Sequence, residues 1–309
     1  EYQELIMGAF RTLRAWSLEA LLPGGAASAH LIWHFLDKLS IDLTVPIAIT
    51  GPDSHSVRMR RACKTGPWAN QLAMFVIPGH DIVSDHLRRT GSFHCPYSFF
   101  NLAAQASETN TSRSSDGGGG LPLLRVVEVG GFLGDCLLWL GAWLGPARLR
   151  ALEVEPVVAA TERLRESLAH AGLAAAVTVV TEALGDGGWF GIRASGNADP
   201  NFHVHQQSDS RPSGNTGLAW RRLRTLDEVL ESWNGLGADN SVDLLRIKTA
   251  NFEASILAGS KRLLGVGRVR RILIDDGDYS GVQAFMSHWP RYRLKEKRTP
   301  HGDALLYEL

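Results

Sequence analysis

The chain contains 309 residues, of which 32 are Lys or Arg and 32 are Asp or Glu, so its formal charge at neutral pH is zero. This balance argues against a nucleic-acid surface built on bulk positive charge. With 44% hydrophobic and 21% charged residues, the composition is typical of a packed globular protein and excludes wholesale disorder. The length fits one large domain, or one domain with a small extension.

The cysteine content and the hydropathy pattern bear on location. Cys63, Cys95 and Cys136 are too few and too scattered to predict a disulfide framework, which favours a reducing, cytoplasmic compartment. No apolar run reaches the roughly 18 residues that a membrane helix needs, so no membrane partner is expected. Because the chain starts at Glu1 and not at Met, a lost targeting segment stays open as an alternative.

The N-terminal part carries no recognisable motif. Its apolar spacing predicts two helices and a strand, at residues 2–22, 31–39 and 41–49. A polar run that ends in four glycines occupies residues 108–120 and predicts a flexible linker over about 106–120. We therefore expect a small N-terminal extension over residues 1–68 and a main domain over residues 69–309.

Downstream of the linker, apolar strands alternate with helices. Strands are predicted at 125–129, 148–154, 175–180, 242–247 and 269–275, and helices at 135–144, 157–171, 225–233 and 252–264. Residues 185–220, rich in Gly, Ser, Asn and Pro, are predicted to be irregular, and residues 292–297 and 304–309 to form a C-terminal antiparallel hairpin. The pattern predicts an α/β fold with a doubly wound, mostly parallel sheet.

The first predicted strand ends in a glycine motif that spans Glu128, Gly130 and Gly134, and a helix follows at once. A doubly wound sheet binds nucleotides at this position. A dinucleotide site would read G-x-G-x-x-G, with the pyrophosphate at the helix N-terminus. Here the pattern is E-x-G-x-x-x-G, and the acid would repel a pyrophosphate. S-adenosylmethionine, which carries a sulfonium and an ammonium group, fits better, with Glu128 at the mouth of its amino-acid end.

A second acid, Glu155, ends the next predicted strand directly before Pro156. It lies at about the ~20-residue distance where a carboxylate accepts hydrogen bonds from a ribose diol. Glu153 has the same strand parity but lies one pleat inside, so Glu155 is the favoured candidate. The alternative is a plain strand end that meets a helix whose first turn accepts Pro.

Several stretches resemble the FkbM family of S-adenosylmethionine-dependent methyltransferases. They cover about residues 70–309 and comprise residues 75–78, 81–84, 91–93, 126–134, 152–156, 183–186, 225–228 and 242–247, with Glu253, Leu257 and Gly259. The resemblance implies a Rossmann-like methyltransferase with a seven-stranded sheet that ends in an antiparallel hairpin. It implies methyl transfer to a hydroxyl of a sugar, polyketide or other small molecule, and it adds Ala183 to the cofactor-binding candidates.

The chain departs from the family pattern after the fourth strand. The family usually reads Lys-Ile-Asp-Val-Glu-Gly, whereas residues 246–251 read Arg-Ile-Lys-Thr-Ala-Asn. Two acids at the edge that faces the methyl group are thus replaced by Lys248 and Ala250, which alters the catalytic end. In the glycine motif, Gly131 and Phe132 replace the usual Ala and Asn.

Three residues are candidates for catalysis. Lys248 either binds an anionic acceptor or is a solvated loop charge. Asp275, with Asp276, either acts as a base or belongs to a turn. His94 either serves as a base on the acceptor side or is an ordinary loop histidine. Asp243 lies at the opposite end of its strand and is expected to serve structure.

Two further clusters have alternative interpretations. His203 and His205 have the spacing of two metal ligands but lack a third, so a surface loop is favoured and no metal is predicted. Arg221, Arg222 and Arg224 either bind an acidic substrate or form a solvated strand edge. Three functions stay open: a small-molecule O-methyltransferase, a catalytically weakened homologue that binds the cofactor as a partner or regulatory module, and a nicotinamide-dependent oxidoreductase.

Overall fold

The computed structural model describes residues 56–58, 73–75, 123–193, 206–208, 218–236, 241–249, 251–275, 279–297 and 304–309. The chain divides into two compact units, Glu1–Val45 and Pro46–Leu309, and every described residue lies in the second. Several predicted features lie outside the described residues: the N-terminal helices and strand, the boundary at residue 68, the linker, His94, His203 and His205.

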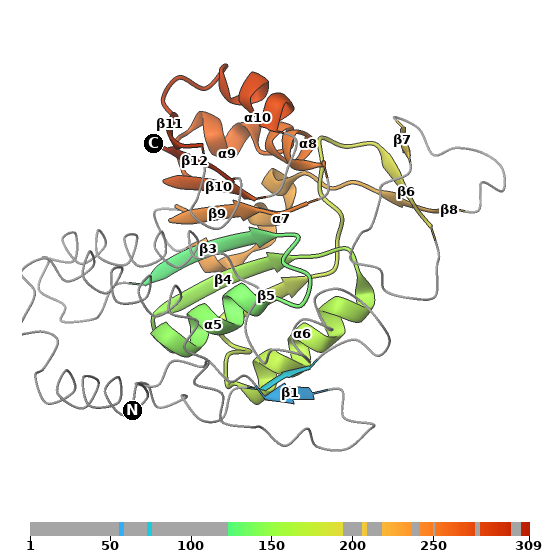
Figure 1. Cartoon of the computed structure of the whole chain (residues 1–309), viewed down its shortest axis with the longest axis vertical. Coiled ribbons are helices and arrows are strands. Elements are labelled where there is room, and N and C mark those ends of the chain that lie inside the picture. The colour runs from blue at the N-terminus through green and yellow to red at the C-terminus, as the bar shows by residue number, and fades with distance from the viewer. Residues whose placement is uncertain are drawn as a thin grey trace, which may run out of the picture. The chain divides into compact units, whose positions relative to one another are not determined.

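A seven-stranded sheet forms the centre of the second unit (Figure 1). Its strands are β3 (Leu124–Val129), β4 (Leu149–Val154), β5 (Val177–Val180), β9 (Leu244–Ile247), β10 (Arg271–Asp275), β11 (Arg293–Glu296) and β12 (Ala304–Glu308). They lie in the order β11-β12-β10-β9-β3-β4-β5, and only β12 runs antiparallel to its neighbours. The predicted mostly parallel sheet with a C-terminal antiparallel hairpin is confirmed.

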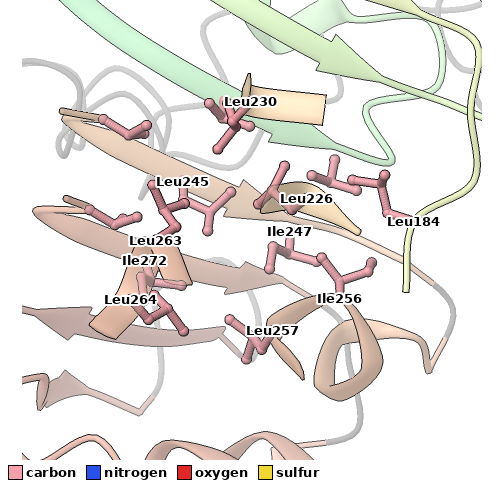
Figure 2. Close-up of a cluster of buried hydrophobic side chains, with 14 of the residues drawn as sticks. Leu184, Leu226, Leu230, Leu245, Ile247, Ile256, Leu257, Leu263, Leu264 and Ile272 are labelled. Carbon is pink, nitrogen blue, oxygen red and sulfur yellow. The ribbon is translucent and has the colours of Figure 1, made fainter. Parts of the chain in front are cut away.

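Helices cover both faces of this sheet. Two pack on one face, α5 (Asp135–Leu144) and α6 (Val158–His170), and the opposite face is covered by α7 (Leu226–Ser232), α8 (Glu253–Ala258), α9 (Lys261–Gly265) and α10 (Tyr279–Met286). Alternate strand residues point to opposite faces. Val126 of β3 therefore joins the cluster with Leu137 of α5, whereas Val127 joins the cluster with Leu226 of α7. Figure 2 shows the second cluster, with Leu245 of β9 among the leucines of the covering helices.

Three elements differ from the prediction. The helix expected over 252–264 is two helices, α8 and α9, which are interrupted at Gly259 and Ser260. Helix α10 was not predicted. Residues 185–220 are not irregular throughout, because β6 (Trp189–Arg193), β7 (Gln206–Ser208) and β8 (Leu218–Arg222) form a three-stranded antiparallel sheet. These strands are too short for a periodic signal, and their pairing spans intervals of the chain rich in turn residues.

A small two-stranded sheet lies against α6. Strand β1 (Ser56–Arg58) pairs antiparallel with β2 (Ala73–Phe75), and the backbone N–H of Phe75 donates to Oγ of Ser167 at 2.8 Å. Strand β1 belongs to the predicted extension, so this part of the extension is joined to the domain by backbone pairing. Across the described ranges, no helix combines the length and the apolar character that spanning a membrane requires.

Candidate functional site

The glycine motif forms a tight loop between β3 and α5. Gly130 and Gly134 have φ angles of 80° and 64°, in the left-handed region that glycine adopts without steric cost. A Cβ at position 130 would lie 2.1 Å from the backbone carbonyl oxygen of Lys248, at the end of β9. Gly130 is therefore required by the close approach of two backbone segments, before any ligand is considered.

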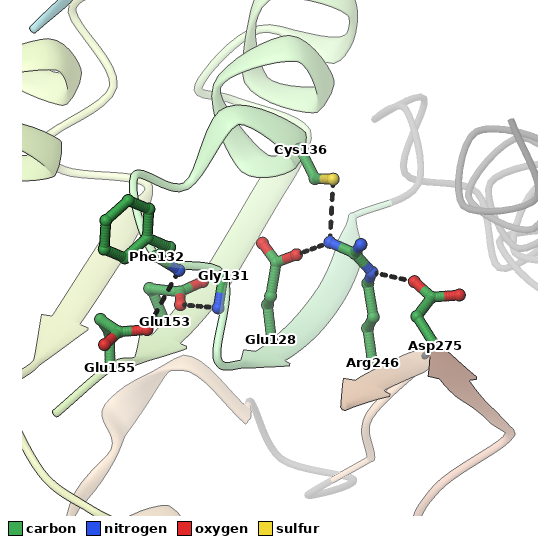
Figure 3. Close-up of polar contacts among 8 residues, drawn as sticks. All are labelled: Glu128, Gly131, Phe132, Cys136, Glu153, Glu155, Arg246 and Asp275. Atoms are coloured by element: carbon green, nitrogen blue, oxygen red, sulfur yellow. Dashed lines mark hydrogen bonds and ion pairs between the residues drawn. The ribbon is translucent and has the colours of Figure 1, made fainter. Parts of the chain in front are cut away.

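Two carboxyl groups at the end of β4 hold this loop (Figure 3). Oε1 of Glu153 accepts the backbone N–H of Gly131 at 2.8 Å, and Oε2 of Glu155 accepts that of Phe132 at 3.1 Å. The second oxygen of Glu155 accepts the N–H of Val157 at 2.9 Å. Glu155 lies one pleat further out, as the sequence predicted. Burial raises its pKa to about 7, against the hydrogen bonds from Val157 and Phe132, which lower it.

Glu153 explains one departure from the resembled family. A Cβ at Gly131 would lie 2.6 Å from both carboxyl oxygens of Glu153, a distance that real Cβ atoms do not tolerate. The Ala that the family usually carries at this position does not fit while Glu153 points at the loop. Gly131 and Glu153 are therefore a coupled pair.

The loop and the segment between β9 and α8 each contain a non-glycine residue in the left-handed region. Asn251, with φ of 66°, stands where the family has Gly, and Asn is one of the few other residues that tolerate this conformation. Phe132, with φ of 55°, stands where the family has Asn, and an aromatic residue is strained there. Its ring is buried in the cluster between the sheet, α5 and α6, so apolar burial offsets the strain.

A buried arginine on β9 links the other acids of the site. The guanidinium of Arg246 pairs with Glu128 of β3, and its Nε lies 2.7 Å from Oδ2 of Asp275 on β10 (Figure 3). Strand register explains this arrangement, because Arg246 directly faces Glu128 across the parallel pair. Nη1 of Arg246 also lies 2.8 Å from Sγ of Cys136. Contrary to the sequence expectation, Cys136 is disulfide-bonded, and its partner lies outside the described residues.

The position of Glu128 differs from the prediction. It was expected at the mouth of the site, but its side chain is 0% exposed and paired with Arg246, because it points inward under α5. Burial raises the pKa of Glu128, and the charge of Arg246 works in the opposite direction. Burial also works against the charge of Arg246, but the carboxylates of Glu128 and Asp275 outweigh it and raise the guanidinium pKa. The pair is an internal support of the loop.

The structure describes two of the three catalytic candidates, Lys248 and Asp275. Lys248 follows β9, and its backbone N–H donates to the carbonyl of Val129 at 2.9 Å, so it lies beside the glycine loop. Asp275 is buried and its carboxylate is engaged by Arg246. His94, Ala250 and Asp276 lie outside the described residues. Asp243 has the expected structural role, since it accepts the N–H of Arg125 and pairs with Arg270 at the opposite edge of the sheet.

Sequence reasoning missed Arg246 and set Glu153 aside. Arg246 is an ionisable residue inside an otherwise apolar strand, and Glu153 lies between two apolar residues at the buried end of β4. This is the signal that could have found them, because buried charges need partners. Glu253 supports the same region, since its Oε1 accepts the N–H and the hydroxyl of Thr249 at 3.1 and 3.0 Å. In the part of the chain that the structure describes, no cluster of three His, Cys, Asp or Glu residues suits a metal ion.

A cavity of about 650 Å³ opens beside Glu155, at the ends of β4 and β5. Its walls include Pro156, Thr181, Ala183, Trp189, Trp220 and Arg222. This volume lies in the range of roughly 300–1,000 Å³ typical of small-molecule sites. Ala183, a candidate from the resemblance, therefore lines a cavity that begins next to the favoured ribose-binding acid. A second cavity of about 470 Å³ lies on α7 and α9, away from the strand ends.

No protein-family profile matches the chain, and no curated protein matches it. Among solved structures it is similar to methyltransferase FkbM from Methylobacillus flagellatus KT, with 17% identity and a TM-score of 0.41 over 60% of this chain and 44% of that chain. The N-terminal domain of human METTL16 in complex with SAH matches with 13% identity and a TM-score of 0.40, over 73% and 79% of the two chains. Cofactor-bound Rv0187 from MTB matches with 16% identity and a TM-score of 0.39, over 69% and 80%. The chain thus spans less than half the length of the FkbM methyltransferase.

Proposed function

We propose that the chain binds S-adenosylmethionine at the C-terminal ends of β3 and β4 and is a methyltransferase that acts on a hydroxyl of a small molecule. The observation that carries this proposal is the charge around the glycine loop. Among the described residues one basic side chain, Arg246, and seven acidic ones are buried: Glu128, Asp135, Glu153, Glu155, Asp243, Glu253 and Asp275. All of these acids except Asp243, which lies at the opposite edge of the sheet, belong to the region of the loop.

This charge distribution separates the possible ligands. Asp135 occupies the first turn of α5, where a dinucleotide would place its pyrophosphate against the helix N-terminus. The surrounding acids raise the electrostatic cost of placing an anionic pyrophosphate at this helix terminus. A ligand with a sulfonium and an ammonium group is attracted by the same charges. The geometry therefore favours S-adenosylmethionine over a nicotinamide cofactor.

The residues present fit such a ligand. Each oxygen of Glu155 accepts one backbone N–H and keeps a second lone pair for a ribose hydroxyl. The cavity beyond Pro156 and Ala183 has room and two half-buried tryptophans for an adenine ring. Gly130 and Gly131 are half-buried, so the loop remains partly accessible to the amino-acid end. When bound, the cofactor supplies a methyl group on a positively charged sulfur.

The contribution of the chain to transfer is positioning. Holding two reactants in line replaces their bimolecular encounter in solution. This positioning alone raises the reaction rate by several orders of magnitude, without any catalytic base. Lys248, at the strand end beside the loop, is suited to attract an anionic acceptor and to orient its hydroxyl. The expected acceptor is therefore a small molecule, with no nucleic acid or membrane needed.

One observation favours the alternative of a cofactor-binding homologue with weak transfer. The resembled family carries an acid where this chain has Lys248, and the buried carboxylate of Asp275 is already engaged by Arg246. A chain of this kind would bind the cofactor and its demethylated product while acting as a partner or regulatory module.

Calorimetric titration tests the cofactor. We expect heat of binding with S-adenosylmethionine and with S-adenosylhomocysteine, and none with NAD. Glu162→Gln, at an exposed position of α6, is the matched control and should bind like the natural chain. Tight NAD binding, or no response to either methyl compound, would contradict the assignment.

Incubation with methyl-labelled cofactor and a panel of hydroxylated acceptors separates the two functions. The resembled family carries acids at positions 248 and 250. If these acids assist methyl transfer, Lys248→Asp combined with Ala250→Glu should raise the rate of transfer to neutral acceptors by up to about 10²- to 10⁴-fold, with cofactor affinity unchanged. If instead the natural chain methylates an anionic acceptor and Lys248→Asp abolishes this, Lys248 binds the acceptor. Unchanged turnover on acceptors of either charge would exclude this strand end as the reaction site.

A further inference from the structure

Two buried carboxyl groups face each other beneath the glycine loop. Glu128 and Glu153 are direct register partners on the parallel strands β3 and β4, so their side chains leave the same face of the sheet side by side. Neighbouring strands lie about 4.8 Å apart, which brings two such carboxyl groups into hydrogen-bonding range. Both side chains are completely buried.

Each of the two groups has one satisfied oxygen and one that lacks a partner. Oε1 of Glu128 is bound by Arg246, and Oε1 of Glu153 accepts the N–H of Gly131. Oε2 of Glu128 and Oε2 of Glu153 are buried and have no hydrogen-bond partner. Two carboxylate oxygens only accept hydrogen bonds, so two ionised groups cannot satisfy each other. One proton between them satisfies both.

The neighbouring charges decide which group holds the proton. Glu128 has the guanidinium of Arg246 beside it, whereas Glu153 is flanked by the carboxyl groups of Glu128 and Glu155. Asp135 and the sulfur of Cys136 face the cluster from α5, and Asp275 faces Arg246 from β10. Burial, followed by the charges of Glu128 and Glu155, raises the pKa of Glu153 well above its usual value.

We propose that Glu153 is protonated in the folded protein at neutral pH and donates its Oε2 proton to Oε2 of Glu128, so that one shared proton fixes the glycine loop. Glu128 stays ionised against Arg246. The carbonyl oxygen of the Glu153 acid accepts the N–H of Gly131. Glu153 is thereby a positioning residue, which acts on the ligand site through the loop.

Removal of this proton has a defined consequence. Above the pKa of Glu153, two adjacent carboxylates would share a buried space, a state that like charges do not tolerate. The folded state binds more protons than the unfolded state, so stability falls as pH rises towards that pKa, by at most about tenfold in the folding equilibrium per pH unit. The effect belongs to the loop itself and does not depend on the identity of the bound molecule.

The decisive variant is Glu153→Gln. Its amide has the shape of the protonated acid, with an N–H₂ that donates to Glu128 and an oxygen that accepts from Gly131. We expect the variant to be at least as stable as the natural chain above neutral pH and to lose the alkaline fall in stability. Denaturant unfolding at several pH values measures both, with Glu162→Gln as the exposed control. A destabilised variant that keeps the alkaline fall would overturn the proposal.

A measurement on the natural chain covers the case in which the variant does not fold. Infrared difference spectra should show the C=O band of a protonated carboxyl group at about pH 8.5, where Glu155 is mostly ionised. Absence of this band would overturn the shared proton whatever the variant does. Because both tests are made without ligand, their failure leaves the calorimetric test of the cofactor unaffected.

The coupling to Gly131 gives an independent test. Gly131→Ala forces a Cβ against the Glu153 carboxyl and should lower the unfolding midpoint, whereas Gly131→Ala combined with Glu153→Ala removes the clash. We expect the second change to recover part of the midpoint lost by the first. A double variant whose loss equals the sum of the two single losses would show that Glu153 does not hold the loop.

Discussion

The two faces of the central sheet differ at the same level of the strands. Towards α7 to α10, the strand ends carry Val129, Ile247 and Ile274, all in one apolar cluster. Towards α5, the neighbouring positions carry Glu128 and Arg246, which are equally buried but charged. Apolar burial is insensitive to pH, whereas buried charges depend on their partners and on protonation. At this level of the strands, one face therefore continues the apolar core, whereas the other carries the ionisable groups of the candidate site.

The largest effect is expected from breaking the charged face. Arg246→Met leaves Glu128 and Asp275 buried without their cation and should lower the free energy of unfolding by about 3–5 kcal/mol. Arg246 works against the burial that raises the pKa of Glu128, so this pKa should rise further without the cation, and the loss should shrink as pH falls and Glu128 becomes protonated. Urea unfolding at about pH 5 and about pH 8 measures this. Arg246→Lys, which keeps the charge, is the control, and an equal loss at both pH values would contradict the interpretation.

The matched change on the apolar face is Leu245→Ala. Leu245 is fully buried next to Arg246 in the chain but points to the opposite face. Loss of its side chain should lower the free energy of unfolding by about 2–5 kcal/mol through lost burial and a residual cavity. The same urea series should show no dependence on pH. A clear pH dependence would mean that the two faces are not independent.

Glu155 sharpens the comparison at the ligand site. Glu155→Ala should weaken cofactor binding by about 1.5–3 kcal/mol, the usual worth of hydrogen bonds to a charged group. Since its folded pKa is raised from 4.5 to about 7, its stabilising effect on the free protein is complete below the unfolded value and is lost as pH rises through 7. Cofactor affinity should change in the opposite direction, because the ionised carboxylate is the stronger acceptor. Calorimetry at about pH 6 and about pH 8 checks this, and Glu155→Gln should show no such trend.

The smallest effect is expected at the cap of α7, on the apolar face. Oγ1 of Thr225 accepts the N–H of Glu228 at 3.2 Å, and Oε2 of Glu228 accepts the N–H of Thr225 at 2.9 Å. Thr225→Ala should lower the free energy of unfolding by about 0.5–2 kcal/mol. Thermal unfolding measures the loss, with Thr225→Ser as the control that keeps the cap. A loss shared equally by both variants would assign the effect to the methyl group.

Local periodicity predicted most of the fold. The helix expected over residues 135–144 matches α5, and the strands next to it agree with β3 and β4 to within a residue at their N-terminal ends. These elements follow from short-range apolar patterns and from the glycine motif. Strands β6 to β8 could not be predicted in this way, because their pairing depends on contacts between distant segments.

The site was predicted in its residue types but not in its pairings. Glu128 and Glu155 were predicted as cofactor-binding acids, and both lie next to the glycine loop, yet the sequence gives no indication that Glu128 points inward to Arg246. That contact depends on the register of two strands that are far apart in the chain. A different register, that of β3 with β4, explains why Glu153, which the prediction placed one pleat inside, holds Gly131.

Strands β3 and β9 are neighbours in the sheet but are made at different times during synthesis. Glu128 and Arg246 are separated by 118 positions, although their strands are neighbours in the sheet. Synthesis proceeds from the N-terminus, so β3, β4 and β5 are made before β9. A nascent chain that has emerged only through β5 would already contain the acids at the ends of β3 and β4, but not the arginine that neutralises them. During that interval we expect the acids of the loop to stay hydrated, and the buried cluster to be completed only when β9 docks.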